Sequence, residues 1–473
     1  MKILIKNMLL KKLINNLSTK KKKINIRGLS NDSRKIKKGF IFFAVKGNQF
    51  NGEKFIEKAV KKGASVLVCS QNCKYANKKI TIIRSSNVRS LLSEISSKFY
   101  RKKPKNIIAV TGTNGKTSVA DLFYQILNLN KIRVASIGTL GIKYKGKIIK
   151  SNLTSPDTIL LHKTLEKLKK NKIDNVIIEA SSHGLYQNRL NNLNIKAGIF
   201  TNFSQDHLDY HKSMKSYLDA KLILFRNILK KNKVIISDTT IKEYNLLRKI
   251  SKKRKLRLID INSLEEKLNK KFDLNLNEYQ VKNLAMAAAA AKLCKLNEKK
   301  ILESLSKIKD VDGRLELIKT FPNNVKVYVD FAHTPDGLKK SIQALKKMYS
   351  GDISLVFGCG GDRDFKKRPI MAKIASNNCK NIYVTDDNPR NENPKKIRKI
   401  ILRNIKNKSC FEIGNRAKAI KTAILNAAAN ETILIAGKGH ETQQIFKNKI
   451  VSISDKQIIN KFNLKIEKIQ KKI

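Results

Sequence analysis

The chain has 473 residues, which suggests about three domains at the usual ~150 residues each. Lysine and arginine number 100 against 37 acidic residues, and the formal net charge is +63. So large a charge would suit a nucleic-acid-binding protein, but the lysines are spread along the whole chain among asparagine and isoleucine. We therefore attribute the charge to a general drift of composition and expect no specific nucleic-acid partner.

The cysteines and apolar runs bear on the compartment. The six cysteines form no C-x-x-C pair and show no metal-ligand spacing with histidine, so reduced thiols in a cytoplasmic protein are the simplest interpretation. No stretch approaches the ~18 apolar residues of a membrane span, and the apolar runs of the basic N-terminus are too short for a signal peptide.

The first predicted unit, residues 1–103, is a small α/β domain. Its polar loops at 31–34 and 47–52 are, by themselves, only hydrogen-bonding loops. Short apolar runs separated by these loops predict strands at 39–45, 64–69 and 80–84 and a helix at 53–62.

The second unit, residues 104–318, begins at Pro104 and alternates strands with helices, which favours a mostly parallel sheet covered on both faces. We interpret the lysine-rich segment 249–271 as a surface excursion. The predicted elements are strands at 107–110, 134–137, 176–180, 197–200 and 234–237, a helix at 118–129, and an alanine-rich helix that begins at Asn283.

The third unit, residues 319–473, is predicted to be another open α/β sheet. Its last segment, 456–473, has the composition of a basic helix. Strands are expected at 325–331, 353–357, 382–385 and 432–436, with helices between them.

A loop typical of phosphate binding lies between the strand 107–110 and the helix that follows. Gly112 and Gly115 let backbone N–H groups turn toward phosphate oxygens at a helix N-terminus. Lys116 would neutralise the outer phosphates, and the Thr117 hydroxyl would hold Mg²⁺. The spacing is imperfect, because Val110 stands where the common pattern has a glycine. The alternative is an ordinary glycine turn that caps a helix.

Two further segments of the second unit carry candidate metal ligands. Glu179 ends a buried apolar run, where a carboxylate suits Mg²⁺; otherwise it would simply cap the next turn. The loop 201–211 contains Asp206, His207, Asp209 and His211, which suggests metal coordination and charge steering.

Four polar segments of the third unit follow predicted strands, where open α/β sheets bind ligands. Together they offer arginine for a carboxylate and acidic groups for an ammonium, a set that suits a zwitterion. The four segments lie at 330–336, 357–364, 386–390 and 437–441.

These motifs resemble those of the Mur ligases over nearly the whole chain. The run 111–117 resembles their ATP loop, and the segments around Glu179 and Asp206 are similarly close. The Asp387–Arg390 run resembles the signature of the members that select meso-diaminopimelate over lysine. The resemblance implies a small N-terminal α/β domain, a central P-loop-like ATPase domain with a mostly parallel sheet, and a C-terminal Rossmann-like domain.

The resemblance also assigns roles by position. It implies ATP as co-substrate with Mg²⁺, and catalytic roles for Lys116, Lys221 and His207. The ATP residues would be Gly112, Thr113, Asn114, Gly115, Lys116, Thr117, Asn283, Arg314 and Asp330. The metal would be held by Thr117, Glu179, His207 and Lys221, the last as a carbamate.

Two substrate sites follow in the same way. The UDP-sugar would contact Ser33, Asn48, Gln49, Phe50, Thr154, Ser155, Ser181, Gln187 and Arg189. The diaminopimelate pocket would contain Arg363, Asp387, Asn388, Pro389, Arg390, Gly437 and Glu441.

The implied reaction joins meso-diaminopimelate to UDP-MurNAc-L-Ala-D-Glu through an acyl phosphate, in a monomer without a membrane span. Three alternatives stay open at this point. The first is a related ligase, either a sister Mur ligase that adds L-lysine or D-Ala-D-Ala or a folate polyglutamate synthetase. The second is a basic nucleic-acid-binding NTPase, and the third is a binding protein with a decayed site.

Overall fold

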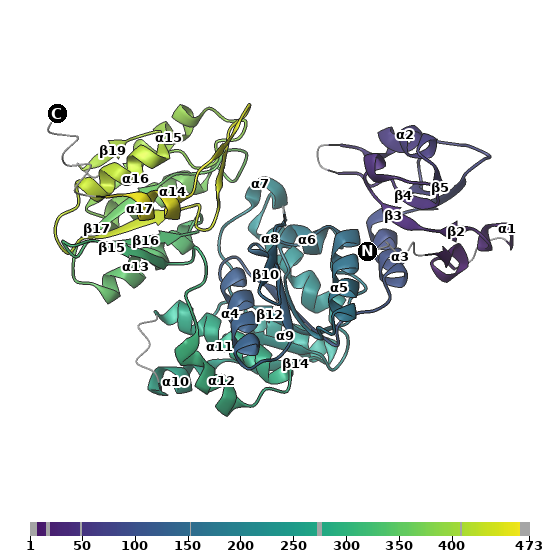
Figure 1. Cartoon of the computed structure of the whole chain (residues 1–473), viewed down its shortest axis with the longest axis horizontal. Helices are drawn as coiled ribbons and strands as arrows, with labels where there is room; N and C mark the ends of the chain where they lie inside the picture. The colour runs from purple at the N-terminus through teal and green to yellow at the C-terminus, as the bar shows by residue number, and fades with distance from the viewer. Residues whose placement is uncertain are drawn as a thin grey trace.

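The computed structural model describes residues 7–15, 19–47, 50–151, 153–271, 277–406 and 409–463. Three α/β domains follow one another along the molecule, with the central domain between the other two (Figure 1). Each domain is built on its own main sheet, of four, eight and six strands respectively. Among the described residues, no helix combines the length and apolar character that a membrane crossing requires.

The N-terminal domain contains a parallel sheet in the order β3-β4-β5-β6. Its strands are β3 Gly28–Ser30, β4 Phe40–Phe43, β5 Ala64–Ser70 and β6 Thr81–Ser85. The predicted helix at 53–62 is present as a 3₁₀ turn, Gly52–Phe55, followed by α2, Ile56–Lys61. Helix α3, Val88–Phe99, buries Leu92, Ile95 and Phe99 in the core under this sheet and also contacts α5, Thr158–Lys170, of the central domain.

A two-stranded ribbon of β1, Met8–Leu9, and β2, Asn25–Ile26, extends the N-terminal domain. The short helix α1, Thr19–Lys22, lies between these two strands in the sequence. The expected loop residues Asn48 and Gln49 lie outside the described residues.

The central sheet has the order β10-β9-β8-β11-β7-β12-β13-β14 and is parallel except for the β8-β9-β10 end. All predicted strands of this domain are present. The bounds are β7 Asn106–Thr111, β8 Val134–Gly138, β9 Gly141–Tyr144, β10 Lys147–Ile149, β11 Asn175–Glu179, β12 Ile195–Phe200, β13 Val234–Ser237 and β14 Arg257–Asp260.

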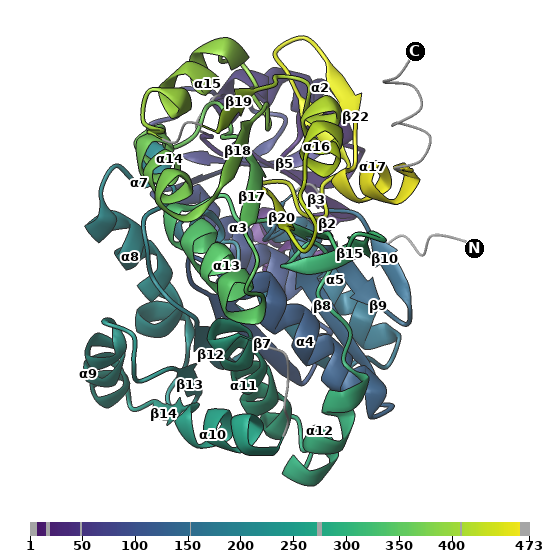
Figure 2. The same ribbon diagram turned by 90° about the vertical axis from the view of Figure 1, so that its left-hand side faces the viewer.

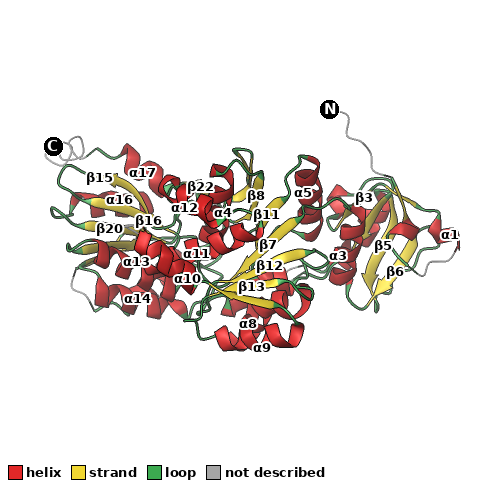
Figure 3. Ribbon diagram, turned by 90° about the horizontal axis from the view of Figure 1, so that it is seen from below, coloured by secondary structure: helices red, strands yellow, loops and turns green. Residues whose placement is uncertain are grey.

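Helices cover both faces of the central sheet, as Figures 2 and 3 show. One face carries α4 Lys116–Leu129, α10 Asn262–Lys271, α11 Glu278–Leu293 and α12 Glu298–Ser304. The other carries α5 Thr158–Lys170, α6 Ser182–Tyr186, α8 Met214–Ile223 and α9 Tyr244–Arg254. The short helix α7, Leu208–His211, precedes α8.

Two predictions for this domain are wrong. The lysine-rich segment 249–271 is no surface excursion, because it completes α9, adds the edge strand β14 and forms α10. Its lysines up to Lys270 take solvent-facing positions, while Ile261, Leu264 and Leu268 at helical spacing are buried in the core. The alanine-rich helix begins at Glu278, not at Asn283, because Asn277 caps it through a capping box with Gln280.

The C-terminal sheet has the order β15-β16-β20-β17-β18-β19, and only the edge strand β15 is antiparallel. The four predicted strands are present. The bounds are β15 Glu316–Thr320, β16 Lys326–Asp330, β17 Ile353–Phe357, β18 Asn381–Val384, β19 Cys410–Glu412 and β20 Thr432–Ala436. A hairpin of β21, Gln443–Ile445, and β22, Ile450–Ser452, follows β20.

Helices α13 Pro335–Met348, α14 Lys367–Asn378 and α15 Pro394–Leu402 pack on one face of this sheet, and α16 Arg416–Leu425 and α17 Asp455–Lys461 on the other. The expected basic helix at 456–473 is shorter among the described residues. It ends at Lys461, and Phe462 is extended and buried against the core that contains Phe321. Positions from 464 lie outside the described residues.

Candidate active site between the central and C-terminal domains

One cavity of about 600 Å³ lies between the carboxyl-end loops of the central and C-terminal sheets. The parallel strands β7 and β11 of one sheet and β16, β18 and β20 of the other end at this cavity, as expected for open α/β sheets. Its lining includes the residues predicted separately for ATP, for the metal and for the amino acid. These are Thr113–Thr117, Glu179, His207, Lys221, Asn283, Arg314, Asp330, Arg363, Asp387, Asn388, Arg390, Gly437 and Glu441.

The phosphate loop requires glycine at two positions. Gly112 (φ +148°) has no room for a Cβ beside Thr201, and Gly115 (φ +85°) is the left-handed cap of α4 and lies against Asn283. The Lys116 ammonium donates to the carbonyls of Gly112 and Thr113, both at 2.9 Å, and so holds the loop folded over the start of α4. Burial lowers the pKa of Lys116, and the nearby Arg314 adds to this effect.

Thr117 and Glu179 come together at the base of the cavity. Glu179 Oε2 accepts hydrogen bonds from the hydroxyls of Thr117 (2.9 Å) and Thr139 (3.1 Å), and Oε1 accepts from the Thr139 backbone N–H (2.8 Å). Arg314 of the interdomain segment donates to Thr117 Oγ1 at 2.9 Å. Two adjacent oxygen ligands on a hydroxyl and a carboxylate fit the preference of Mg²⁺ for oxygen.

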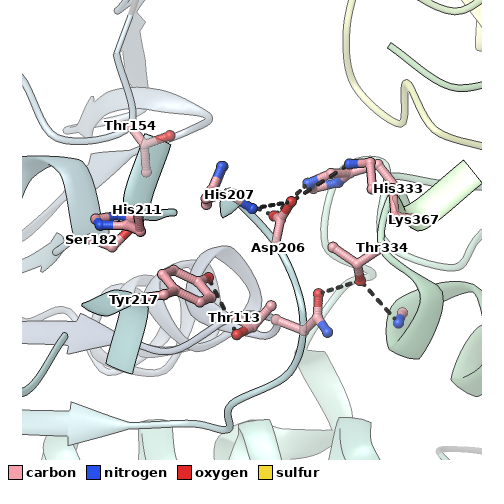
Figure 4. Close-up of polar contacts among 12 residues, drawn as sticks. Thr113, Thr154, Ser182, Asp206, His207, His211, Tyr217, His333, Thr334 and Lys367 are labelled. Atoms are coloured by element: carbon pink, nitrogen blue, oxygen red, sulfur yellow. Dashed lines mark hydrogen bonds and ion pairs between the residues drawn. The ribbon is translucent and has the colours of Figure 1, made fainter. Parts of the chain in front are cut away.

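The loop 201–211 does not bring its four polar side chains to one point. His207 has φ +56° at the start of α7, and its ring stays beside Asp206, whereas His211, four residues on, turns toward helix α6. Asp206 faces the C-terminal domain, whereas His211 Nε2 lies 3.0 Å from Ser182 Oγ (Figure 4). Within the described parts of the chain, no group of three or more His, Cys, Asp or Glu side chains is placed to hold a metal.

Asp206 joins the two domains electrostatically. Its carboxylate lies 3.6 Å from Lys367 Nζ and 3.5 Å from His333 Nε2, both of the C-terminal domain, and 3.4 Å from His207 Nε2 (Figure 4). Burial alone would raise the pKa of Asp206, but Lys367 and the two histidines lower it well below its ordinary value. Sequence reasoning missed Lys367, because a single lysine among so many carries no signal.

Lys221 is almost fully buried beneath the phosphate loop. Its Nζ donates to the Gly112 carbonyl at 2.7 Å and lies 4.2 Å from the centre of the Tyr217 ring. The Tyr217 hydroxyl in turn donates to Thr113 Oγ1 (Figure 4). Burial, aided by the charge of Lys116, lowers the pKa of Lys221 well below that of an ordinary lysine. The amine therefore tends to the uncharged form.

The nucleotide residues predicted outside the loop also line the cavity. Asn283 of α11 touches Gly115, and Arg314 lies over the Phe331 ring at 4.4 Å. Asp330 ends β16, accepts a hydrogen bond from Ser341 and has its pKa raised by burial.

The predicted amino-acid pocket occupies the C-terminal side of the cavity. Asp387 Oδ1 accepts from the backbone N–H of Asn388 (2.6 Å), and Asn388 Nδ2 donates to Glu441 Oε2 (2.9 Å). Arg390 Nη1 donates to the Gly361 carbonyl at 2.8 Å. Exposed Arg363 lies at the edge of the cavity, whereas Pro389 does not line it. Two carboxylates and two guanidinium groups are thus available to one ligand.

The predicted UDP-sugar residues of the central domain form a hydrogen-bonded row beside Glu179. Ser155 Oγ contacts Ser181 Oγ at 3.0 Å, and Arg189 donates to the Ser155 carbonyl (2.6 Å) and to Gln187 Oε1 (2.7 Å). Thr154 and Ser181 also line the cavity. Buried Ser33 and exposed Phe50 belong to the N-terminal domain.

Arg89 of helix α3 is a functional candidate that sequence reasoning missed. It reaches from the N-terminal domain to Gln187 Oε1 (3.5 Å), which Arg189 also contacts, and donates to the Lys46 carbonyl at 2.8 Å. Burial lowers the pKa of both arginines, and neither forms a salt bridge with the described carboxylates. Two such guanidinium groups are chemically suited to an anionic ligand, and no local pattern reveals them because they lie far apart in the sequence.

A glycine loop that faces two carboxylates and two guanidinium groups across one cavity, between two of three α/β domains, fits a multidomain ligase. Comparison with protein families gives three matches in chain order. They are "Mur ligase family, catalytic domain" over residues 25–100, "Mur ligase middle domain" over 110–302 and "Mur ligase, glutamate ligase domain" over 313–439. The chain belongs to the Mur ligase family.

Similar proteins share almost the full length of the chain. The UDP-N-acetylmuramoyl-L-alanyl-D-glutamate–2,6-diaminopimelate ligase of Rickettsia bellii is 39% identical and aligns over 92% of this chain and 95% of its own. The enzyme of that name from Zymomonas mobilis is also 39% identical, over 91% and 92%. A solved structure of a ligase of the same name has a TM-score of 0.64 and 28% identity, with 96% and 98% of the two chains covered.

Proposed function

We propose that this chain is an ATP-dependent ligase that joins meso-diaminopimelate to UDP-N-acetylmuramoyl-L-alanyl-D-glutamate, a step of peptidoglycan precursor synthesis. One observation carries the proposal. The same cavity contains a phosphate loop on one side and, on the other, two carboxylates and two arginines suited to a zwitterion. The names of the similar proteins point to the same substrates.

The nucleotide would be held by the phosphate loop, with Asn283, Arg314 and Asp330 closing over it from the domain junction. Thr117 and Glu179 would hold Mg²⁺, because their oxygens are already adjacent and open to the cavity. When bound, Mg²⁺ would neutralise charge on the phosphate oxygens. Lys221 fits this metal only as an anionic carbamate, since a lysine ammonium would repel it.

The residues of the chain act mainly by position and charge. Lys116 and Arg314 would stabilise the charge that develops as an oxygen of the substrate carboxylate bonds to the γ-phosphorus and ADP leaves. Asp387 and Glu441 would orient the amine of diaminopimelate. Its nitrogen then attacks the acyl carbon, phosphate leaves and the nitrogen loses a proton.

The sugar-nucleotide would lie along Ser155, Ser181, Gln187 and Arg189 and reach Ser33 and Phe50 of the N-terminal domain. The predicted contacts of Asn48 and Gln49 are part of the same proposal. Arg89 and Arg189 would bind a phosphate or carboxylate group of this substrate, because guanidinium groups bind both in a bidentate manner.

The domain limits 1–103, 104–318 and 319–473 are also proposed. The three sheets support this division, with the difference that β15 begins at Glu316. We also propose that the chain acts as a monomer and that it acts in the cytoplasm.

Phosphate release tests the proposal directly. Purified protein with ATP, Mg²⁺ and UDP-MurNAc-L-Ala-D-Glu should release phosphate with meso-diaminopimelate, and much more slowly with L-lysine. Phosphate release should also be much slower when the amine is D-Ala-D-Ala and the UDP-linked substrate is the one that a D-Ala-D-Ala-adding ligase uses. Preference for one of the latter would move the chain to a sister activity. ATP turnover that requires polynucleotide and falls steeply with salt would instead favour a nucleic-acid-dependent NTPase.

A further inference from the structure

Lys438 is a buried lysine that neither the sequence analysis nor the proposed reaction uses. It follows β20 in the loop 437–441, and its side chain is 0% exposed. A buried ammonium is costly unless it is paired and hydrogen-bonded. Lys438 Nζ has three acceptors: Glu441 Oε2 at 2.8 Å, the Gln443 carbonyl at 2.6 Å and Asn388 Oδ1 at 3.2 Å.

These contacts fix the orientation of the Asn388 side chain. Its Oδ1 accepts from Lys438 Nζ and from the backbone N–H of Ile445 (3.0 Å), so its Nδ2 must point the other way, toward Glu441 Oε2. With the ammonium gone, the Ile445 N–H would be the remaining donor to Asn388 Oδ1 among these contacts, so the amide would be held less firmly in this orientation.

Lys438 also determines which oxygen of Glu441 is free. Oε2 accepts from both Lys438 Nζ and Asn388 Nδ2, whereas Oε1 accepts no hydrogen bond from the residues that the structure describes. Glu441 and Asn388 line the cavity, and Lys438 does not. The lysine therefore lies behind the pocket and acts through two residues that face a ligand.

We propose that Lys438 is a positioning residue for amino-acid recognition, which presents Glu441 Oε1 to the ammonium of the incoming substrate. The proposal rests on the proposed function for the identity of that substrate. The Gln443 carbonyl ties the same ammonium to the β21–β22 hairpin, so the hairpin and the pocket share one support.

The test is the variant Lys438→Met, which keeps the length of the side chain and removes its charge. The KM for meso-diaminopimelate should rise about 10- to 100-fold, as expected when charged hydrogen bonds are lost. The KM values for ATP and the UDP-sugar should stay within about twofold of wild type, because the contacts of Lys438 lie on the amino-acid side only. Lys447→Met, at an exposed position of the same hairpin, is the matched control.

A double-mutant cycle separates positioning from a general loss of stability. In an Asn388→Ala background, Lys438→Met should raise the KM for the amino acid less than in wild type, because the amide it orients is gone. Equal effects in both backgrounds, or a parallel rise of all three KM values, would overturn the proposal. If Lys438→Met does not fold, Asn388→Ala and Glu441→Gln are compared by the same KM split, and unaltered amino-acid KM values there would overturn it.

The phosphate-release assay with different amino acids distinguishes failure of the proposed function from failure of the Lys438 proposal. If wild type used an amino acid other than meso-diaminopimelate, the proposed function would fail, and the same cycle run with that amino acid would still test Lys438.

Discussion

Replacing Arg390 with alanine should weaken the use of meso-diaminopimelate while leaving the use of ATP unchanged. Arg390 Nη1 is committed to the Gly361 and Asn388 carbonyls, at 2.8 and 3.3 Å. Its Nη2 and Nε make no hydrogen bond to the residues that the structure describes, and the side chain lines the cavity. Burial, with the neighbouring Arg363, lowers the pKa of Arg390, as expected for a partly buried guanidinium group that forms no salt bridge with the described residues.

The expected size follows from this geometry. A hydrogen bond to a charged group is worth about 1.5–3 kcal/mol, so loss of one ligand carboxylate contact should raise the KM about 10- to 150-fold. Arg390→Lys should fall between wild type and Arg390→Ala, since it keeps the charge and loses the planar fork. Arg403→Ala, an exposed arginine of the same domain, serves as control.

The assay is phosphate release at saturating ATP and UDP-sugar, with meso-diaminopimelate varied. A KM for diaminopimelate in Arg390→Ala equal to that of wild type would refute the assignment of the pocket. A matching rise in the KM for ATP would show instead that the domain junction had been disturbed.

Three further predictions concern single lysines and one ion pair. Lys116→Ala should lower the rate of phosphate release by about 100-fold or more with an unchanged circular dichroism spectrum, and near-normal turnover would remove the phosphate-loop assignment. Because burial lowers the pKa of Lys221, its neutral amine is easier to form and should attack CO₂ and lose a proton to give a carbamate, so activity should fall in CO₂-depleted buffer and return with bicarbonate; indifference to CO₂ would count against it. Arg416→Met leaves Asp455 buried without its bidentate partner (2.7 and 2.8 Å), which should destabilise the C-terminal domain by about 3–5 kcal/mol in urea unfolding, whereas the double variant with Asp455→Leu should recover most of that loss.

Periodicity in the sequence was sufficient for most of the fold. The buried strands of the central and C-terminal sheets are continuous apolar runs, and the structure confirms them. The edge strand β14 escaped detection because its neighbouring helices are rich in lysine, and only the spacing of Ile261, Leu264 and Leu268 marks the buried face. Composition therefore misled where the period of the apolar positions did not.

Some parts of the candidate site could be predicted from the sequence and others could not. The phosphate loop is local, so the continuous segment 107–129 was enough to predict that strand, glycine turn and helix follow one another. Arg89 and Gln187 are 98 positions apart in the sequence, and they meet because helix α3 packs on the central domain. The loop around His207 shows the limit of local spacing, because Asp206 and His207 stay together while His211 turns toward Ser182.

Polar contacts from the substrate-facing loops connect the two halves of the cavity. Asn114 of the phosphate loop donates to Asp336 at the start of α13 (2.9 Å), and Thr334 donates to Asn114 Oδ1 (3.2 Å). Arg314 joins the junction to Thr117 at 2.9 Å. Some of the groups that join the two domains, Asn114, Thr117 and Arg314, are thus ones that would contact the nucleotide.

Because these interdomain contacts are polar, ligand binding should affect how the two domains close. Polar interdomain groups can exchange partners with water at small cost, so opening this junction should cost less than opening an apolar one. Lys367 and the histidines hold the pKa of Asp206 well below its usual value of about 4, so its carboxylate stays charged, and its contribution to the closed form is lost only as the pH falls through that lowered pKa. Near neutral pH, closure should therefore depend on which ligands occupy the cavity and very little on the charge of Asp206.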